Sequence, residues 1–250
     1  MNLDELVAEA EKVLNCGNLP DYPQSHNGLQ LANNGTVTKI GAAVDASLPV
    51  FEKAVAAGVD LLVVHHGMFW QGVQRLTGNQ YRKLKLAMDH NLAVYSAHIP
   101  LDVHPTFGNN ALLAKKVGIL DPTPFFPWKG IELGLKASVP CTLEDLKSRT
   151  ESAVEGPVHL RGNPDDPCGV VGVITGGAGS EVAALKESGV DTFITGEGPH
   201  WSFPLAEELG LNVLYAGHYA TETFGVRALA QKLAGLAKIP HQFLHHPTGL

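Results

Sequence analysis

The segment from Asp60 to Gly67 limits the fold more than any other part of this chain. Its apolar run, Leu-Leu-Val-Val, ends in two adjacent histidines, His65 and His66. A short run of consecutive apolar residues is typical of a strand that is buried on both faces, as in a parallel sheet covered by helices. Open α/β folds place their functional groups at the carboxyl ends of such strands. The two histidines are therefore expected at the functional edge of an α/β sheet.

Two further apolar segments end in a histidine that is followed, four residues later, by a carboxylate. Residues 92–97 lead to His98 and Asp102, and a later segment leads to His218 and Glu222. Imidazole and carboxylate groups are common metal ligands, but a histidine at a strand end is also a common polar cap that binds no ion. The repetition of the pattern favours a metal site over a set of structural caps.

The number of candidate ligands favours two ions over one. Adjacent strand residues point to opposite faces, so His65 and His66 would reach two neighbouring ions more easily than one. A single tetrahedral ion uses four ligands, whereas five or six mixed nitrogen and oxygen donors suit two ions about 3.5–4 Å apart. The candidates are His65, His66, Asp102, His218 and Glu222, with His98 as a further group. Glu222 is the expected bridge, because a carboxylate has two oxygens to share.

Sequence similarity between two parts of the chain predicts two related lobes. The aligned blocks are residues 40–47 with 171–178 and, at the same offset, residues 57–60 with 188–191. On this register Glu197 lies opposite His66. Chance similarity between βα units is the alternative, but several blocks match in order. We therefore expect an α/β protein of two pseudo-repeated lobes with mostly parallel sheets and a dinuclear metal site in the cleft between them.

The organisation of the chain follows from its periodicity. The first lobe is expected over residues 1–124 and the second over 125–216, because prolines and aromatic residues within 119–140 interrupt the alternation. Residues 217–250 are expected to supply metal ligands and to pack back on the lobes. Hydrophobic spacing predicts helices over 3–14, 48–57, 79–90, 108–117 and 224–236, and strands over 40–45, 59–64, 92–97, 130–139 and 158–161.

Two glycine-containing segments of the second lobe have alternative interpretations. Residues 175–180 could form a loop that contacts an anionic group, but they match neither a dinucleotide-binding nor a Walker sequence, which favours a tight turn. Residues 195–201 contain Glu197 and His200, which would either belong to a plain loop or lie near the metal ligands. Together with His98, they are the candidate catalytic residues.

Composition excludes several classes of protein. The chain has 250 residues, 44% of them hydrophobic, and a formal net charge of −7 without a cluster of Lys and Arg, so non-specific nucleic-acid binding is not expected. No apolar stretch approaches the ~20 residues that cross a bilayer. The amino terminus lacks a signal sequence, so we expect a cytoplasmic protein. Three widely separated cysteines favour reduced thiols over a disulfide framework.

A set of motifs gives the chain a family resemblance. They are His26-Asn27-Gly28-Leu29-Gln30, His65-His66-Gly67, Ala97-His98-Ile99-Pro100-Leu101-Asp102, Gly108-Asn109-Asn110, Thr195-Gly196-Glu197 and Gly217-His218-Tyr219-Ala220-Thr221-Glu222. Together they resemble the Nif-three-like (Ngg-interacting-factor-three-like) family, whose members are often labelled GTP cyclohydrolase I type 2 homologues. The resemblance covers essentially the whole chain, which lacks the large insert of longer members.

The resemblance implies an arrangement of the site. It implies two similar α/β lobes around a dinuclear metal site, commonly assembled as a homohexameric toroid. Carried over by motif, His66 and Asp102 would hold one ion. His65 and His218 would hold the other, and Glu222 would contact both. The mixed ligand set accepts zinc, iron, manganese, nickel or cobalt.

Two functions are compatible with such a site. The first is a metal-dependent hydrolase of GTP-cyclohydrolase type, or one that hydrolyses a phosphoester or nucleotide. The second is a non-catalytic metal-binding protein, such as a metal chaperone, a storage protein or a ring-forming scaffold. His98 has no assigned ligand role and is expected to hydrogen-bond within the site. Closure of the site by His98 and residues 68–70 would favour the non-catalytic function.

Overall fold

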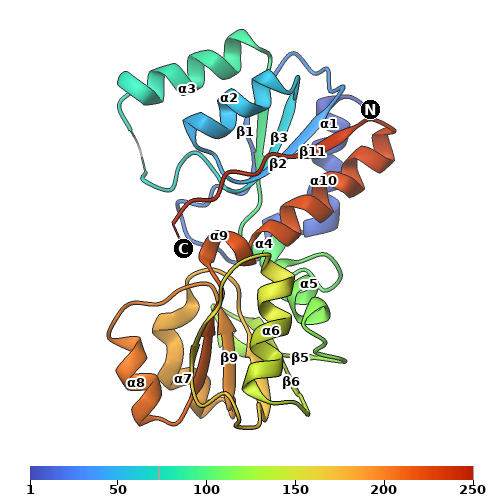
Figure 1. Cartoon of the computed structure of the whole chain (residues 1–250). Coiled ribbons are helices and arrows are strands. Elements are labelled where there is room, and N and C mark those ends of the chain that lie inside the picture. Colours follow the sequence, from blue (N-terminus) through green and yellow to red (C-terminus); the bar gives the residue numbers. More distant parts are fainter. Residues whose placement is uncertain (73, 250) are drawn as a thin grey trace. The chain divides into compact units, whose positions relative to one another are not determined.

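The computed structural model describes residues 1–72 and 74–249 and shows a mixed α/β protein with two sheets (Figure 1). The chain divides into two compact units. Unit 1 comprises Met1–Leu101 and Gly225–His246, and unit 2 comprises Asp102–Phe224 with the end of the chain from Pro247. The first boundary thus lies upstream of the one predicted after residue 124. The reason is that α5 (Asn109–Lys116) packs against α6 and strands of unit 2.

Unit 1 is built on a five-stranded sheet with the order β1-β4-β3-β2-β11. Its strands are β1 (Gly28–Leu31), β2 (Ile40–Asp45), β3 (Leu61–His66), β4 (Ala93–Ser96) and β11 (His241–Phe243). All neighbouring pairs are parallel except β1 with β4. Its helices are α1 (Leu3–Leu14), α2 (Leu48–Ala56), α3 (Gly78–Asp89) and most of α10 (Thr223–Ala237). Helices α2 and α3 lie side by side (Figure 1).

The strand that carries the paired histidines lies two residues further along than the predicted strand 59–64. Helix α2 ends with the amide of Val59 bonded to the carbonyl of Ala54, which delays the start of β3 to Leu61. Residues Leu61 to Val64 are buried on both faces, as expected for a central parallel strand. His65 and His66 are therefore the last two residues of the strand.

Unit 2 contains a six-stranded sheet with the order β5-β6-β8-β9-β10-β7. Its strands are β5 (Thr123–Trp128), β6 (Ile131–Ser138), β7 (His159–Arg161), β8 (Val170–Val173), β9 (Thr192–Thr195) and β10 (Asn212–Tyr215). Among these described strands only β8, β9 and β10 pair in parallel, so the prediction of a mostly parallel second sheet was wrong. A two-residue turn at Lys129 and Gly130, both with positive φ, folds β5 back on β6 as an antiparallel hairpin.

Unit 2 contains the helices α5, α6 (Leu143–Val154), α7 (Val182–Glu187), α8 (Ser202–Glu208) and α9 (His218–Thr221). The short helix α4 (Ile99–Asp102) contains the boundary between the two units. Single-turn 3-10 helices occupy Cys16–Asn18 in unit 1 and Ala178–Glu181 in unit 2. Helices α5 and α6 pack together, as do α7 and α8 (Figure 1).

Strand register confirms the internal repeat. Ile40 pairs with Leu61 between β2 and β3, and Val171 pairs with Thr192 between β8 and β9. These are the positions that the sequence alignment matched, at the same offset. The repeat consists of β2, β3 and β4 in unit 1 and of β8, β9 and β10 in unit 2. In both units its third strand is parallel to the second and pairs on its other side with an antiparallel strand, β1 or β7. The two sheets therefore share one β-α-β-α-β core.

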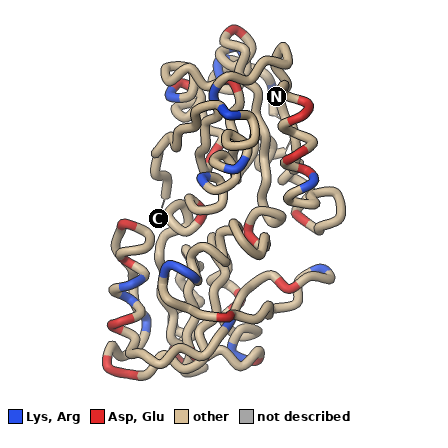
Figure 2. The backbone as a smooth tube through the Cα atoms, turned by 90° about the vertical axis from the view of Figure 1, so that its right-hand side faces the viewer, with Lys and Arg blue, Asp and Glu red and all other residues tan. Residues whose placement is uncertain are grey.

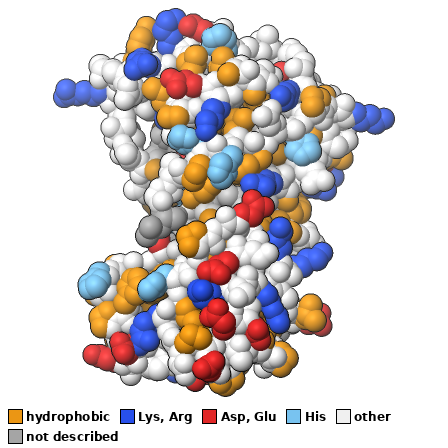
Figure 3. Space-filling model, in the orientation of Figure 1, with side chains coloured by type: hydrophobic (Ala, Val, Ile, Leu, Met, Phe, Trp, Pro, Cys, Tyr) orange, Lys and Arg blue, Asp and Glu red, His pale blue; other side chains and the backbone are white. Residues whose placement is uncertain are grey.

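Charged and apolar residues are mixed over the molecule. Acidic and basic positions are interspersed along the backbone of both units (Figure 2). The face shown in Figure 3 likewise mixes apolar, acidic, basic and histidine side chains. Within the described ranges, no helix combines the length and the apolar content that crossing a membrane requires.

Candidate metal centre

Three histidines of unit 1 meet at the carboxyl edge of its sheet. His65 and His66 end β3, and His98 follows the neighbouring parallel strand β4. One nitrogen from each ring can be chosen so that the three atoms lie within 4.8 Å of one another. Because parallel strands end at the same edge, the two sequence motifs are brought together as predicted. This histidine cluster (His65, His66 and His98) could hold a metal ion.

The ring of His65 is fixed by a backbone carbonyl. Its Nδ1 lies 2.9 Å from the carbonyl oxygen of Ala97, and the side chain is fully buried. A carbonyl can only accept a hydrogen bond, so Nδ1 carries the proton. The lone pair of the neutral ring is then on Nε2, which is the arrangement that a metal ligand needs.

Carboxylates fix the other two rings of the cluster. Nδ1 of His66 lies 2.9 Å from Oδ1 of Asp45, and Nδ1 of His98 lies 2.8 Å from Oδ1 of Asp21. Each carboxylate accepts the Nδ1 proton and directs Nε2 away from itself. All three rings thus have the same tautomer when neutral. Histidine ligands of metal ions are typically held in this way.

Asp21 was not among the predicted site residues. Its Oδ2 also accepts hydrogen bonds from the backbone amide of Ile99 and the side-chain amide of Asn27. Burial raises the pKa of Asp21, but its hydrogen bonds, first of all with His98, outweigh burial and lower the pKa below its ordinary value. Asp21 lies in an irregular loop that is far, in the sequence, from the strand ends that carry the histidines. Neither hydrophobic periodicity nor motif spacing could therefore indicate it.

Aromatic side chains pack against the histidine cluster. The Trp70 ring lies edge to face with His66 at 5.5 Å and with His98 at 4.6 Å between centroids. Tyr22 lies 5.9 Å from His98 and 6.3 Å from Trp70. Trp70 therefore packs beside the cluster.

Asp102 is a buried carboxylate of unit 2. Its Oδ1 accepts hydrogen bonds from Nδ2 of Asn109 at 2.8 Å and from Oγ1 of Thr175 at 3.2 Å. The backbone amide of Thr175 donates to Oδ1 of Asn110 at 2.9 Å, which fixes the threonine in turn. Asp102 is only 7% exposed. These contacts hold one carboxylate oxygen and orient the group.

His218 and Glu222 lie one turn apart, at the start and just beyond the end of helix α9. Nε2 of His218 lies 3.1 Å from Oε1 of Glu222, and its Nδ1 lies 2.8 Å from Oε1 of Glu197. Burial lowers the pKa of His218, but hydrogen bonds with Glu222 and Glu197 outweigh it and raise this pKa from 6.5 to about 9. Without a metal ion, the ring is therefore protonated at neutral pH.

Glycines allow three loops of unit 2 to approach one another around His218. The amides of Gly196 and Glu197 both donate to the carbonyl of Gly176, at 2.9 and 3.0 Å. A Cβ at Gly196 would lie 2.6 Å from the backbone of His218. The segment 175–180 thus forms a tight turn beside His218 and Glu222.

The candidate catalytic residue His200 lies at the surface of unit 2. His200 is exposed, and its ring packs near Phe203 at 6.2 Å between centroids.

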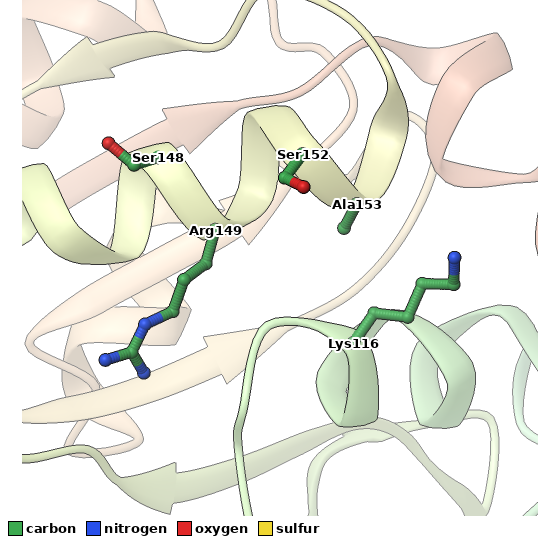
Figure 4. Close-up of a pocket in the computed structure, with 5 residues that line it drawn as sticks. All are labelled: Lys116, Ser148, Arg149, Ser152 and Ala153. Carbon is green, nitrogen blue, oxygen red and sulfur yellow. The ribbon is translucent and has the colours of Figure 1, made fainter.

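A cavity of about 440 Å³ lies between α5 and α6 (Figure 4). It is lined by Lys116, Ser148, Arg149, Ser152 and Ala153, none of which is a predicted site residue.

Fold and site together define an α/β protein with two related sheets and His, Asp and Glu groups that could bind metal. The chain belongs to the Duf34/NIF3 (NGG1p interacting factor 3) family, whose sequence pattern it matches over residues 1–247. This confirms the resemblance drawn from the motifs.

Relatives and solved structures resemble the chain over nearly its full length. A protein of Deinococcus radiodurans named GTP cyclohydrolase 1 type 2 homolog is 40% identical over 249 residues, which cover 99% of this chain and 94% of that protein. The crystal structure of TTHA1606 from Thermus thermophilus has a TM-score of 0.85 at 38% identity, and both chains are fully covered. Protein ybgI, described as of unknown function, has a TM-score of 0.89 at 32% identity, also with full coverage of both.

Proposed function

We propose that this chain binds two divalent metal ions in one dinuclear centre and acts as a metal-dependent hydrolase. The proposed ligands are those that the motifs predict. His66 and Asp102 hold one ion, His65 and His218 hold the other, and Glu222 contacts both. The donor set of nitrogen and carboxylate oxygen atoms suits zinc, iron, manganese, nickel or cobalt.

The observation that carries the proposal is the fixed Nδ1 atom of each histidine. An oxygen acceptor lies within 2.9 Å of Nδ1 in His65, His66, His98 and His218. Histidines that only cap strands have no need to share one tautomer. Histidines that bind metal through Nε2 all need the lone pair of that atom to be available. The shared orientation therefore supports ligation over a structural role.

The course of the chain supports the assignment of ligands from both units to one centre. The chain passes from unit 1 to unit 2 after Leu101, between His98 and Asp102. It returns to unit 1 after Phe224, just beyond Glu222. These two of the three connections between the units thus begin or end at a predicted ligand motif.

Two bound ions would lower the pKa of a water molecule and stabilise negative charge on a substrate oxygen, which is the chemistry of metal-dependent hydrolysis. The residues of the chain fix the geometry for this reaction. Asn109 and Thr175 orient Asp102, while Glu197 orients His218. The relatives are named as GTP cyclohydrolase homologs, which makes a purine nucleotide the first substrate to test, followed by phosphoesters.

Metal content tests the dinuclear centre. We expect about two equivalents per chain in protein purified without an affinity tag or added metal, and almost none in Glu222→Ala, because that side chain contacts both ions. The variant His65→Ala should lose about one equivalent of metal per chain. Two equivalents retained by Glu222→Ala would exclude the bridge, and a parent protein that binds no added ion would exclude the centre. Turnover of GTP or aryl phosphates should rise with metal content.

A second function is favoured by one observation, the packing of Trp70 against His66 and His98. If the site is closed in this way, the protein would bind or deliver metal without catalysis. Protein loaded with Co²⁺ separates the two functions. A change of its visible spectrum on addition of phosphate or azide shows an open coordination position and supports a hydrolase, whereas an unchanged spectrum supports the non-catalytic function.

We further propose that the chain assembles as a hexameric ring in the cytoplasm. The family resemblance carries this proposal. Light scattering of the eluting protein should give six times the chain mass of 26.6 kDa. A monomer or dimer at micromolar concentration would exclude the ring.

A further inference from the structure

Two cysteines of unit 2 that are far apart in the sequence lie side by side in the fold. Cys141 directly precedes the amino-terminal cap of α6, and Cys168 lies just before β8. Their Sγ atoms are 3.6 Å apart, although 27 positions separate the residues in the sequence. At this distance the two sulfurs are in direct contact.

The backbone holds the two residues opposite each other. An antiparallel bridge joins Thr142, which follows Cys141, to Pro167, which precedes Cys168. The amide of Cys168 donates to the carbonyl of Cys141 at 2.9 Å. Cys141 and Cys168 thus share one of the two hydrogen bonds of a hydrogen-bonded antiparallel pair, in which facing Cα atoms lie about 5.5 Å apart. That spacing lies within the range of about 4.4–6.8 Å found in disulfides. Bond formation thus requires rotation of side chains and no rearrangement of the backbone.

The environments of the two thiols differ. Cys141 is partly exposed, whereas Cys168 is buried and its thiol donates to the carbonyl of Thr142 at 3.1 Å. Burial and the neighbouring Cys141 raise the pKa of Cys168 to about 12, while the charge of Arg149 opposes this shift. An oxidant in solution therefore reaches Cys141 first, and Cys168 stays reduced beside it.

We propose that Cys141 and Cys168 form a reversible disulfide when the protein meets a two-electron oxidant such as hydrogen peroxide. The Cys141 sulfur attacks one peroxide oxygen, the O–O bond breaks, and sulfenic acid and water form. The Cys168 sulfur then attacks the sulfur of that sulfenic acid. The Cys168 proton leaves with the departing hydroxide as a second water. Each sulfur is oxidised by one electron overall, and a dithiol reductant reverses the reaction.

The bond would close a loop that contains α6 and β7 within unit 2. Cross-linking residues this far apart removes conformational freedom from the unfolded chain. We therefore expect the oxidised protein to melt at a temperature higher by on the order of 5 °C.

The test uses the whole chain in its native state. Reduced protein is treated with hydrogen peroxide, the remaining thiols are blocked with N-ethylmaleimide, and the products are mapped by mass spectrometry without reduction. Of the three thiols of the chain, we expect one to remain. A peptide pair joined through Cys141 and Cys168 should appear, and dithiothreitol should remove it.

Two variants make the result specific. Cys16 lies in unit 1, where its sulfur contacts the Tyr95 hydroxyl at 3.7 Å. Cys16→Ser is therefore the matched control and should still form the disulfide. Cys141→Ser should keep both remaining thiols, without the rise in melting temperature. The proposal is overturned if peroxide converts Cys141 to sulfinic acid while Cys168 stays free, or if cross-links involve Cys16 as often as Cys168.

Discussion

Glu197 is aligned with His66 in the internal sequence repeat, and it accepts a hydrogen bond from Nδ1 of His218 at 2.8 Å. In unit 1 a carboxylate on β2, Asp45, fixes a histidine on β3. In the sequence repeat Gly176 is aligned with Asp45. Each unit therefore has a carboxylate that supports a histidine, but in unit 2 it comes from the segment that follows β9. The two related units thus both support a histidine Nδ1 with a carboxylate, but the carboxylates stand at different positions of the repeat.

The support of His66 by Asp45 gives the first prediction. Asp45→Asn replaces a charged acceptor by a neutral amide, which holds the Nδ1 proton less strongly and can direct its own donors at the ring. We expect the affinity for Zn²⁺ to fall about 10- to 100-fold. Competition with a chromophoric chelator measures this affinity. Asp89→Asn is the control, because Asp89 is exposed and pairs with Lys85 at 2.6 Å; equal affinities in both variants would contradict the role of Asp45.

Gly176 and its neighbour provide a matched pair of substitutions. Gly176 has φ +71°, and a Cβ there would collide with Oε1 of Glu222. Gly176→Ala should therefore displace Glu222 and abolish most metal binding. Gly177→Ala adds the same methyl group at a residue with φ −98°, where the nearest atom is Cε1 of His218 at 3.4 Å. Metal content should be much closer to that of the parent in this variant. Circular dichroism must show both variants folded, and similar metal contents would contradict the prediction.

Metal binding at His218 has to displace a proton. The pKa of this ring in metal-free protein is about 9, because the bonds with Glu222 and Glu197 outweigh burial. At pH 7 the ring is protonated, so binding of Zn²⁺ should release that proton, and at pH 10 it should not. Calorimetric titration in buffers of different ionisation enthalpy counts the protons. Glu197→Gln removes one cause of the raised pKa and should reduce the release at pH 7. If the number of protons released does not depend on pH, metal binding does not displace the proton of His218.

Asp21 gives a prediction for stability against pH. Its pKa in the folded protein is below the ordinary value of 3.8, since its hydrogen bonds outweigh burial. The stabilisation is therefore complete above pH ~3.8 and is lost as the pH falls through the lower, folded-state pKa. Asp21→Asn should lower the free energy of unfolding of metal-free protein by ~1–3 kcal/mol at pH 6. Urea titrations should show this difference shrinking at acid pH. A difference that grows on acidification would contradict the assignment.

Much of the fold could be predicted from local patterns. Helix α1 has the predicted bounds because its apolar spacing is regular and Asn2 forms a capping box with Glu5. Thr142 caps α6 in a similar way, with its hydroxyl accepting from the amide of Asp145. The ends of β3 and β4, beside the candidate histidines, lie within two residues of the predicted ends, because a buried strand needs an uninterrupted apolar run.

The parts that local patterns missed depend on long-range packing. Strand β5 contains Pro124 and Pro127, which usually argue against a strand but are tolerated here because β5 is at the edge of its sheet. Asp21 and the contact of Cys141 with Cys168 have no local signal, since they arise only when distant segments meet. The metal ligands themselves stay a prediction.

The sheet of unit 1 is completed by its last strand, β11, which pairs with β2. Between these strands in the sequence lies nearly all of unit 2, as a continuous insertion from Asp102 to Phe224. During synthesis on the ribosome, this segment of unit 2 therefore emerges while the edge of β2 is still uncovered. The segment is continuous in the sequence, whereas unit 1 has to wait for some two hundred further residues after β2 before its sheet is closed.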